Sequence, residues 1–258
     1  MAFKLTPSIF NIFYKSFRRL PRYSKNLTNS DDVLDGLIAY NQHGGYFVPL
    51  SSKHRPAAQS ILNGQVYEPR TIRFMENHCG DGDVVHAGTY FGDFLPGLSK
   101  SMDKNAIIWA FEPNRENFRC AQITVKINNI KNVVLKDIAL SAKEGKCYIL
   151  VQTEEGIHLG GTSTIVNKSE KGKKYLVRAM PLDSIIPKDR NITIMQFDVE
   201  GHEKKVLKGA LKTIQRCKPI LILEDFNKSI ETTWFEENIL SLGYKIIGNI
   251  HYNTVLKI

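Results

Sequence analysis

The sequence predicts an α/β protein with a doubly wound, mostly parallel sheet. From residue 82 onward, short apolar runs alternate with helical stretches, which is typical of strands joined by helical crossovers. The apolar runs are nearly continuous, as in strands buried on both faces. With 258 residues, the chain can bury one such core and still carry an accessory segment.

The first half of the sheet is predicted as three strands and two helices. Pro96 fits the first turn of the first helix, and Asn114 is a candidate N-cap for the second. In chain order these elements are strand 83–88, helix 92–102, strand 106–112, helix 114–128 and strand 132–140.

The second half begins after a less regular region with β-like runs at 146–152 and 175–182. The turn between the last two strands is too short for a helical crossover, so the final strand is expected to enter antiparallel. The remaining elements are strand 192–199, helix 203–216, strand 219–225, helix 229–243 and two strands within 244–258.

Residues 1–66 lack this rhythm and are expected to form a helical accessory region ahead of a domain over residues 67–258. The first 25 residues carry six basic residues and no acid, within a chain of net charge +9. Their apolar residues recur at helical spacing. Such a basic amphipathic helix can lie on an anionic membrane surface, pack on the domain or mediate homo-oligomerisation, and the sequence leaves these uses open.

The four cysteines are far apart and form no C-x-x-C pair, so a reducing cytoplasm is the default expectation. No segment is long and apolar enough to span a bilayer, and none resembles a cleavable signal peptide.

A glycine turn and two acids predict a nucleoside-containing ligand. Gly88 and Gly92 bracket the turn after the first strand, where glycine permits close approach of a ligand. Glu112 follows the second strand, where an acid can accept the hydroxyls of a ribose. Asp137 could reach an adenine amino group. The spacing G-x-G-x-x-G of dinucleotide-binding folds is absent, which disfavours an NAD-dependent oxidoreductase.

Several runs resemble those of the FkbM-type family of class I S-adenosylmethionine-dependent methyltransferases, over roughly residues 67–225. The most specific is "MQFDVEGHEKKVLKGA", and others are "YEPRTIRFM", "VVHAGTYFG", "AFEPNRENF", "IALS", "GGTSTIV" and "MPLDSI". The resemblance implies a Rossmann-like sheet of seven strands with a reversed final strand. It also implies O-methylation of a sugar, glycan or other small hydroxylated metabolite.

The resemblance and the glycine turn together predict eleven residues that bind S-adenosylmethionine. They are Glu68, His86, Gly88, Tyr90, Gly92, Glu112, Pro113, Asp137, Ile138, Ala139 and Asp198.

His86 departs from the family pattern, in which the first strand usually ends in an acid. Either cofactor affinity is reduced, or Glu68 supplies the missing charge. A relative that binds the cofactor without turnover is therefore an alternative to an enzyme. A nucleic-acid methyltransferase is a weaker alternative. The positive charge of the chain suggests it, but the sequence lacks the [DN]-P-P-[YFW] run after the fourth strand.

The catalytic candidates are His202, Asp198 and Glu200. His202 could act as a general base, oriented by either acid, and His158 and His43 are rivals for that role. Histidine spacing predicts no metal site. Asp198, Glu200 and Asp225 could hold magnesium only if the fold brings them together.

Overall fold

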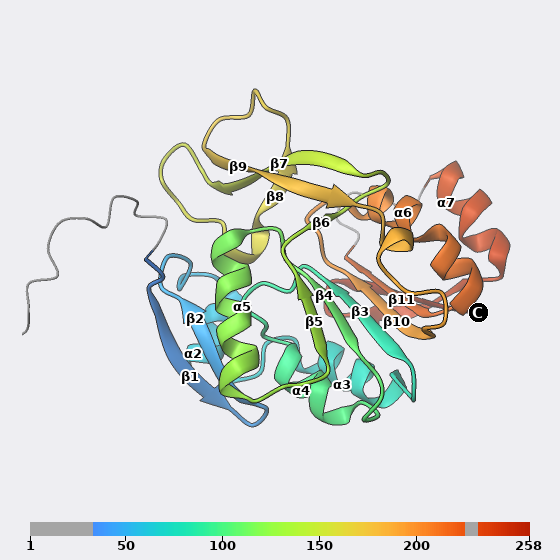
Figure 1. Ribbon diagram of the computed structural model, residues 1–258, viewed down its shortest axis with the longest axis horizontal. Coiled ribbons are helices and arrows are strands. Elements are labelled where there is room, and N and C mark those ends of the chain that lie inside the picture. Colours follow the sequence, from blue (N-terminus) through green and yellow to red (C-terminus); the bar gives the residue numbers. More distant parts are fainter. Residues whose placement is uncertain (1–32, 225–231) are drawn as a thin grey trace, which may run out of the picture. The chain divides into compact units, whose positions relative to one another are not determined.

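The computed structural model describes residues 33–224 and 232–258, of which residues 34–258 form one compact unit (Figure 1). Its centre is a mixed sheet of seven strands. In spatial order they are β12 (Lys245–Ile250), β13 (Asn253–Lys257), β11 (Ile220–Glu224), β10 (Ile192–Phe197), β3 (Asp83–Ala87), β4 (Ile108–Phe111) and β5 (Val133–Lys136).

The strand directions confirm the expected reversal at the end of the chain. β13 pairs antiparallel with both β11 and β12, while the pairs among β11, β10, β3, β4 and β5 are parallel. From β3 the chain proceeds to β4 and β5 on one side, and it returns as β10 on the other. The order of strands therefore reverses between β3 and β10, which is where open α/β sheets bind ligands.

Helices cover both faces of the sheet (Figure 1). Val84 of β3 packs in a cluster with residues of α3 (Pro69–His78) and α4 (Leu95–Ser101). Its neighbour Val85 packs in a second cluster with residues of α6 (Glu203–Cys217) and α7 (Thr233–Asn238). Since successive strand residues point to opposite faces, these clusters explain why the strands read as continuous apolar runs.

The described part of the accessory region is not a helical segment, so that prediction is wrong for residues 36–49. They form a β-hairpin of β1 (Gly36–Asn41) and β2 (Gly44–Pro49), followed by the short helix α2 (Pro56–Leu62). Tyr46 and Val48 alternate into a small core, a period-two pattern that indicates a strand. The basic amphipathic run lies outside the described residues, and the boundary at residue 66 stays a prediction.

The predicted third strand, 132–140, is two strands in different sheets. β5 stays in the main sheet, whereas β6 (Ala139–Leu140) pairs with β9 (Lys173–Met180) in a sheet of four strands. That sheet also contains β7 (Gly145–Gln152) and β8 (Thr164–Val166), so β7 and β9 confirm both β-like runs.

The helices predicted after residue 82 are all found as helices, but their bounds differ from the predicted ones. α5 (Arg115–Ile127) begins after Asn114, whose side chain accepts a hydrogen bond from Glu116 N, as predicted for an N-cap. The expected helix 229–243 is shorter in its described part, where α7 is followed by the 3₁₀ turn η5 (Leu240–Leu242). Two other 3₁₀ turns are η3 (Gly160–Thr162) and η4 (Leu182–Ser184).

Across residues 33–224 and 232–258, no helix combines the length and apolar character that crossing a membrane requires.

A buried acid at the start of β3 joins three segments of the chain. The Asp83 carboxylate accepts hydrogen bonds from Ile107 N and Trp109 Nε1, both at 2.8 Å. It also accepts two from the Arg190 guanidinium, one of them from Nε at 2.7 Å. Asp83 is 1% exposed, whereas the Arg190 side chain is 29% exposed, so the carboxylate is shielded from solvent and the guanidinium only in part.

Replacing Arg190 with methionine is expected to lower the free energy of unfolding by about 2–3 kcal/mol, because it leaves a buried carboxylate without its counter-charge. Equilibrium unfolding in urea measures this. The matched control is Arg178→Met, which removes an exposed ion pair with Glu144 at 3.9 Å and should cost less than about 1 kcal/mol. Equal losses in the two variants would contradict the structural role of Asp83.

Candidate functional site

A pocket with a volume of ≈ 360 Å³ opens at the point where the strand order reverses. Its walls include residues at the carboxyl ends of β3, β10 and β11, together with Tyr67 and Phe94. The charged residues among its described lining are five acids and one arginine: Glu68, Asp93, Asp198, Glu200, Glu224 and Arg55. A pocket with this charge favours a cationic ligand.

Gly88 lets the ends of β3 and β10 approach each other at the pocket floor. Its φ is +87°, and a Cβ atom added there would lie 1.8 Å from the carbonyl oxygen of Asp198. Asp198 N donates a hydrogen bond to Ala87 O at 3.0 Å, just beside this contact. The predicted need for glycine in this turn is therefore explained by contact between two backbones.

Burial raises the pKa of the acids in this pocket. Burial, with repulsion from Glu68, raises the pKa of Asp93 to about 8. Burial, with repulsion from Asp198, raises the pKa of Glu200 to about 7. The pKa of Asp198 lies well above its usual range because of burial and the adjacent Glu224. Each of these carboxylates would be stabilised by a positive charge nearby.

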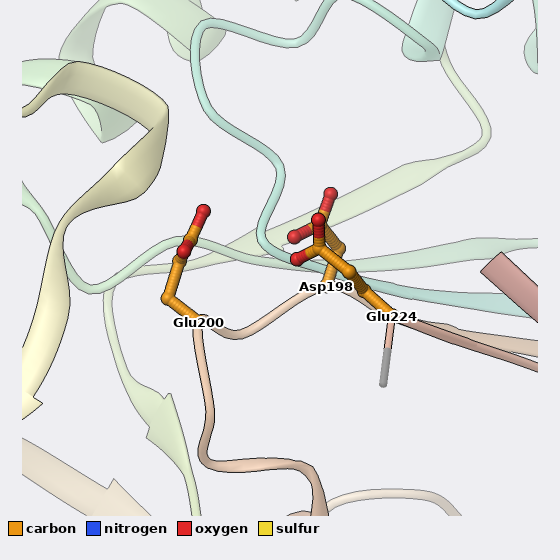
Figure 2. Close-up of side chains that lie close together, drawn as sticks. All are labelled: Asp198, Glu200 and Glu224. Carbon is orange, nitrogen blue, oxygen red and sulfur yellow. The ribbon is translucent and has the colours of Figure 1, made fainter. Parts of the chain in front are cut away.

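Asp198, Glu200 and Glu224 form a cluster at the strand ends, which we call the acid cluster. One carboxylate oxygen from each lies within 4.8 Å of the others, and Figure 2 shows the Asp198 and Glu224 carboxyl groups beside each other. Glu200 has φ +54°, a left-handed conformation that is uncommon for a residue with a side chain and recurs at functional sites. The fold thus joins the two predicted acids with Glu224; Asp225 lies outside the described residues.

His86 faces the pocket as a neutral acceptor. Its Nδ1 lies 3.1 Å from Thr89 Oγ1, and that hydroxyl donates to His86 O. Nδ1 must therefore carry the proton, which leaves a lone pair on Nε2. Burial lowers the pKa of His86 to about 4, and Nε2 has no hydrogen-bond partner among the described residues. An imidazole in this state can accept a hydrogen bond from a ligand, although it lacks the charge of a carboxylate.

Glu112 lies next to this pocket but does not line it. It is 4% exposed and accepts hydrogen bonds from Tyr90 N and Asn114 N, both at 2.8 Å. Glu68, His86, Gly88, Tyr90 and Asp198 are the predicted cofactor residues that line the pocket. The other six are outside its lining: Gly92, Glu112, Pro113, Asp137, Ile138 and Ala139.

The buried Glu112 predicts a dependence of stability on pH. Burial raises its pKa in the folded state to about 8, against the opposing effect of its N–H donors. Between the unfolded pKa, near 4.5, and this value, the folded state holds a proton that the unfolded state has lost. The free energy of unfolding is therefore expected to fall as the pH rises from about 4.5 to about 8, by up to about 1.4 kcal/mol per pH unit. The Glu112→Gln variant should show a flatter pH profile in urea unfolding, and parallel profiles would contradict the prediction.

None of the three candidate histidine bases lines the pocket. His202 occupies the N-cap position of α6, and its Nε2 lies 3.1 Å from Ser141 Oγ. Burial lowers the pKa of His202 to about 4, which makes it a weak base. His158 lies 3.8 Å from Glu116, and His43 lies at the same distance from Glu76.

Sequence reasoning missed several residues of the pocket. Asp93 directly follows the glycine turn, and Glu224 ends β11, which lies within the predicted strand 219–225 and beside the strand that leads to Asp198. Both positions carried a readable signal, since the carboxyl ends of parallel strands meet at one edge of a sheet. Tyr67 and Arg55 enter from segments ahead of β3. Tyr67 begins the run "YEPRTIRFM", whereas no local pattern marks Arg55.

The family description "Methyltransferase FkbM domain" matches residues 86–246. The match covers more than half of the chain, so the protein belongs to the FkbM methyltransferase family. A search of curated proteins found no match.

Solved structures similar to this chain include a methyltransferase FkbM from Methylobacillus flagellatus, with 22% identity and a TM-score of 0.49. The superposition covers 68% of this chain and 43% of that one, so this chain spans less than half the length of that protein. A precorrin-6y C5,15-methyltransferase from Geobacter metallireducens has 12% identity and a TM-score of 0.41, with 72% and 83% covered. A tRNA (uracil-54, C5)-methyltransferase from Pyrococcus abyssi, in complex with S-adenosyl-L-homocysteine, has 12% identity and a TM-score of 0.43, with 86% and 43% covered.

Proposed function

We propose that the protein is an S-adenosylmethionine-dependent O-methyltransferase that acts on a hydroxyl of a sugar, glycan or other small metabolite. Membership of the FkbM family supports methyl transfer. The observation that carries the assignment of the site is the acid-rich pocket at the reversal of strand order. Five carboxylates facing one arginine suit a ligand that is positively charged.

The residues of the pocket fit S-adenosylmethionine. When bound, this cofactor supplies a methyl group on a positively charged sulfur. Asp198 and Glu68 would balance its positive charges, and Gly88 would permit its close approach to the end of β3. His86 Nε2 would accept a hydrogen bond from its ammonium group. Glu112, just outside the lining, would hold the backbone of Tyr90 in place beside it.

The acid cluster provides acceptors for the proton of a substrate hydroxyl. Glu200 and Glu224 line the pocket together with Asp198, so a hydroxyl held among them would be oriented by hydrogen bonds to carboxylate oxygens. Alignment of this kind is the main contribution that a protein makes to a displacement reaction. The choice of a hydroxyl over an amine follows from the resemblance to FkbM-type enzymes.

Transfer of an isotope-labelled methyl group tests the proposal. The protein is incubated with labelled S-adenosylmethionine and a panel of sugars, glycans and hydroxylated metabolites, with RNA and DNA in separate reactions. We expect label on an oxygen of a small acceptor, and at least about 100-fold slower transfer by Glu200→Gln. Glu144→Gln, an exposed change at a residue 73% accessible, should behave as wild type. Cofactor binding without transfer to any acceptor, or transfer only to nucleic acid, would overturn the proposal.

A further inference from the structure

We propose that the acid cluster, together with the side-chain amide oxygen of Gln196, binds one hard divalent cation such as Mg²⁺, Mn²⁺ or Ca²⁺. The cation would bind hydroxyl oxygens of the methyl acceptor in its remaining coordination positions. Its role with the acceptor rests on the proposed function, whereas its binding to the protein does not.

The spacing of the acid cluster suits one ion. Its three carboxylates offer one oxygen each, all within 4.8 Å of one another. Oxygen ligands lie about 2.1 Å from Mg²⁺ and up to about 2.6 Å from Ca²⁺, so two ligands of one ion are separated by no more than about 4–5 Å. The cluster can therefore close around an ion with small movements of its side chains.

The backbone holds two of these ligands in fixed relative positions. β10 and β11 pair in parallel with Phe197 opposite Leu223, which places the following residues, Asp198 and Glu224, side by side. Figure 2 shows Glu200 on the turn after β10, with its carboxyl group on the same side as those of Asp198 and Glu224. Its carbonyl accepts a hydrogen bond from Thr164 Oγ1 at 2.9 Å, which helps fix this turn.

Gln196 provides an independent reason to expect a ligand in this place. It is 2% exposed and lines the same pocket, and its Oε1 has no hydrogen-bond partner within the described ranges. It lies in β10 two residues before Asp198, which directly follows the strand, and both residues line the pocket. Since buried acceptors in folded proteins are almost always satisfied, this oxygen is expected to meet a cation or a donor that the pocket binds.

The chemistry of these groups selects the class of ion. The four ligands are oxygens, three of them from carboxylates, and hard oxygen ligands suit Mg²⁺, Ca²⁺ and Mn²⁺. Four ligands leave at least two positions of a six-coordinate ion for water or for the acceptor. Neighbouring hydroxyls of a sugar can occupy such a pair, and an ion lowers the pKa of a hydroxyl bound to it.

Mn²⁺ provides a direct probe, because its electron paramagnetic resonance signal reports the free ion. We expect the wild-type protein to bind one Mn²⁺ with a Kd below about 1 mM, in competition with Mg²⁺ or Ca²⁺. Glu224→Gln should weaken this binding at least about 10-fold, as loss of a metal ligand does. Glu68→Gln, which removes the same charge from the same pocket outside the acid cluster, should weaken it much less.

The result that would overturn the site is no binding of Mn²⁺ by the wild-type protein, or equal weakening by both variants. Titration with S-adenosylhomocysteine, which keeps the ammonium group of the cofactor, separates the two proposals. Mn²⁺ should stay bound when this ligand saturates the protein, and its displacement would show that the acid cluster holds the cofactor's own cation. Binding of Mn²⁺ without S-adenosylhomocysteine would uphold the cation site and count against the proposed function.

Discussion

Replacing Gly88 with alanine is expected to lower the Tm by about 10 °C and to abolish measurable binding of S-adenosylhomocysteine. The added Cβ would lie 1.8 Å from Asp198 O and 2.9 Å from Asp198 C, so the ends of β3 and β10 must move apart. Overpacking against backbone and the left-handed φ together should cost about 3 kcal/mol or more, which corresponds to that Tm change in a domain of this size. The same movement opens the pocket floor.

Gly80→Ala is the matched control for Gly88. Gly80 also has a positive φ, +60°, but a Cβ added there meets nothing within 4 Å. This variant carries only the cost of the backbone conformation, about 1–2 kcal/mol, and should bind S-adenosylhomocysteine as wild type. Differential scanning calorimetry and binding titration measure both effects. A Gly88→Ala protein as stable as Gly80→Ala would contradict the backbone contact.

Asp198→Asn is expected to raise the Tm and to weaken binding of S-adenosylmethionine at least about 10-fold. Burial and the neighbouring Glu224 raise the pKa of Asp198, so the carboxylate destabilises the folded protein, and a neutral amide relieves that repulsion. Functional sites often carry such a cost in stability. The loss of affinity should be smaller for S-adenosylhomocysteine, whose sulfur is uncharged, because the missing charge no longer faces a sulfonium.

Both ligands are titrated against wild type, Asp198→Asn and the exposed control Glu144→Gln in a buffer that contains a chelator. The chelator removes any contribution from a divalent cation. Equal weakening of S-adenosylmethionine and S-adenosylhomocysteine would show that Asp198 does not act on the sulfonium. A fall in Tm would show that Asp198 stabilises the fold.

The sheet could be predicted from the sequence because its signals are local. The parallel strands β3, β4, β10 and β11 are short apolar runs, and the glycine turn and Asn114 mark helix starts within a few residues. The reversed final strand followed from the length of one turn. The β1–β2 hairpin was missed because its inward pattern is short, resting on Tyr46 and Val48.

The pocket could be predicted only in part, because its chemistry depends on which strands are neighbours. Gly88 and Asp198 were found from their positions after strands. Gln196 Oε1 and His86 Nε2 have no hydrogen-bond partner among the described residues. These two residues lie opposite each other where β10 pairs with β3, and that pairing had to be known before the two side chains could be placed together. His202 was chosen by its distance along the chain from Asp198, but the start of α6 places it against Ser141 instead.

Calorimetric titration of the wild-type protein with S-adenosylhomocysteine, with NAD as control, tests the central claim most directly. The pocket at the reversal of strand order is expected to bind one molecule of S-adenosylhomocysteine and no NAD, and Gly88→Ala should abolish that binding. Absence of S-adenosylhomocysteine binding, or binding of NAD instead, would contradict the assignment of this pocket to a methyl-transfer cofactor.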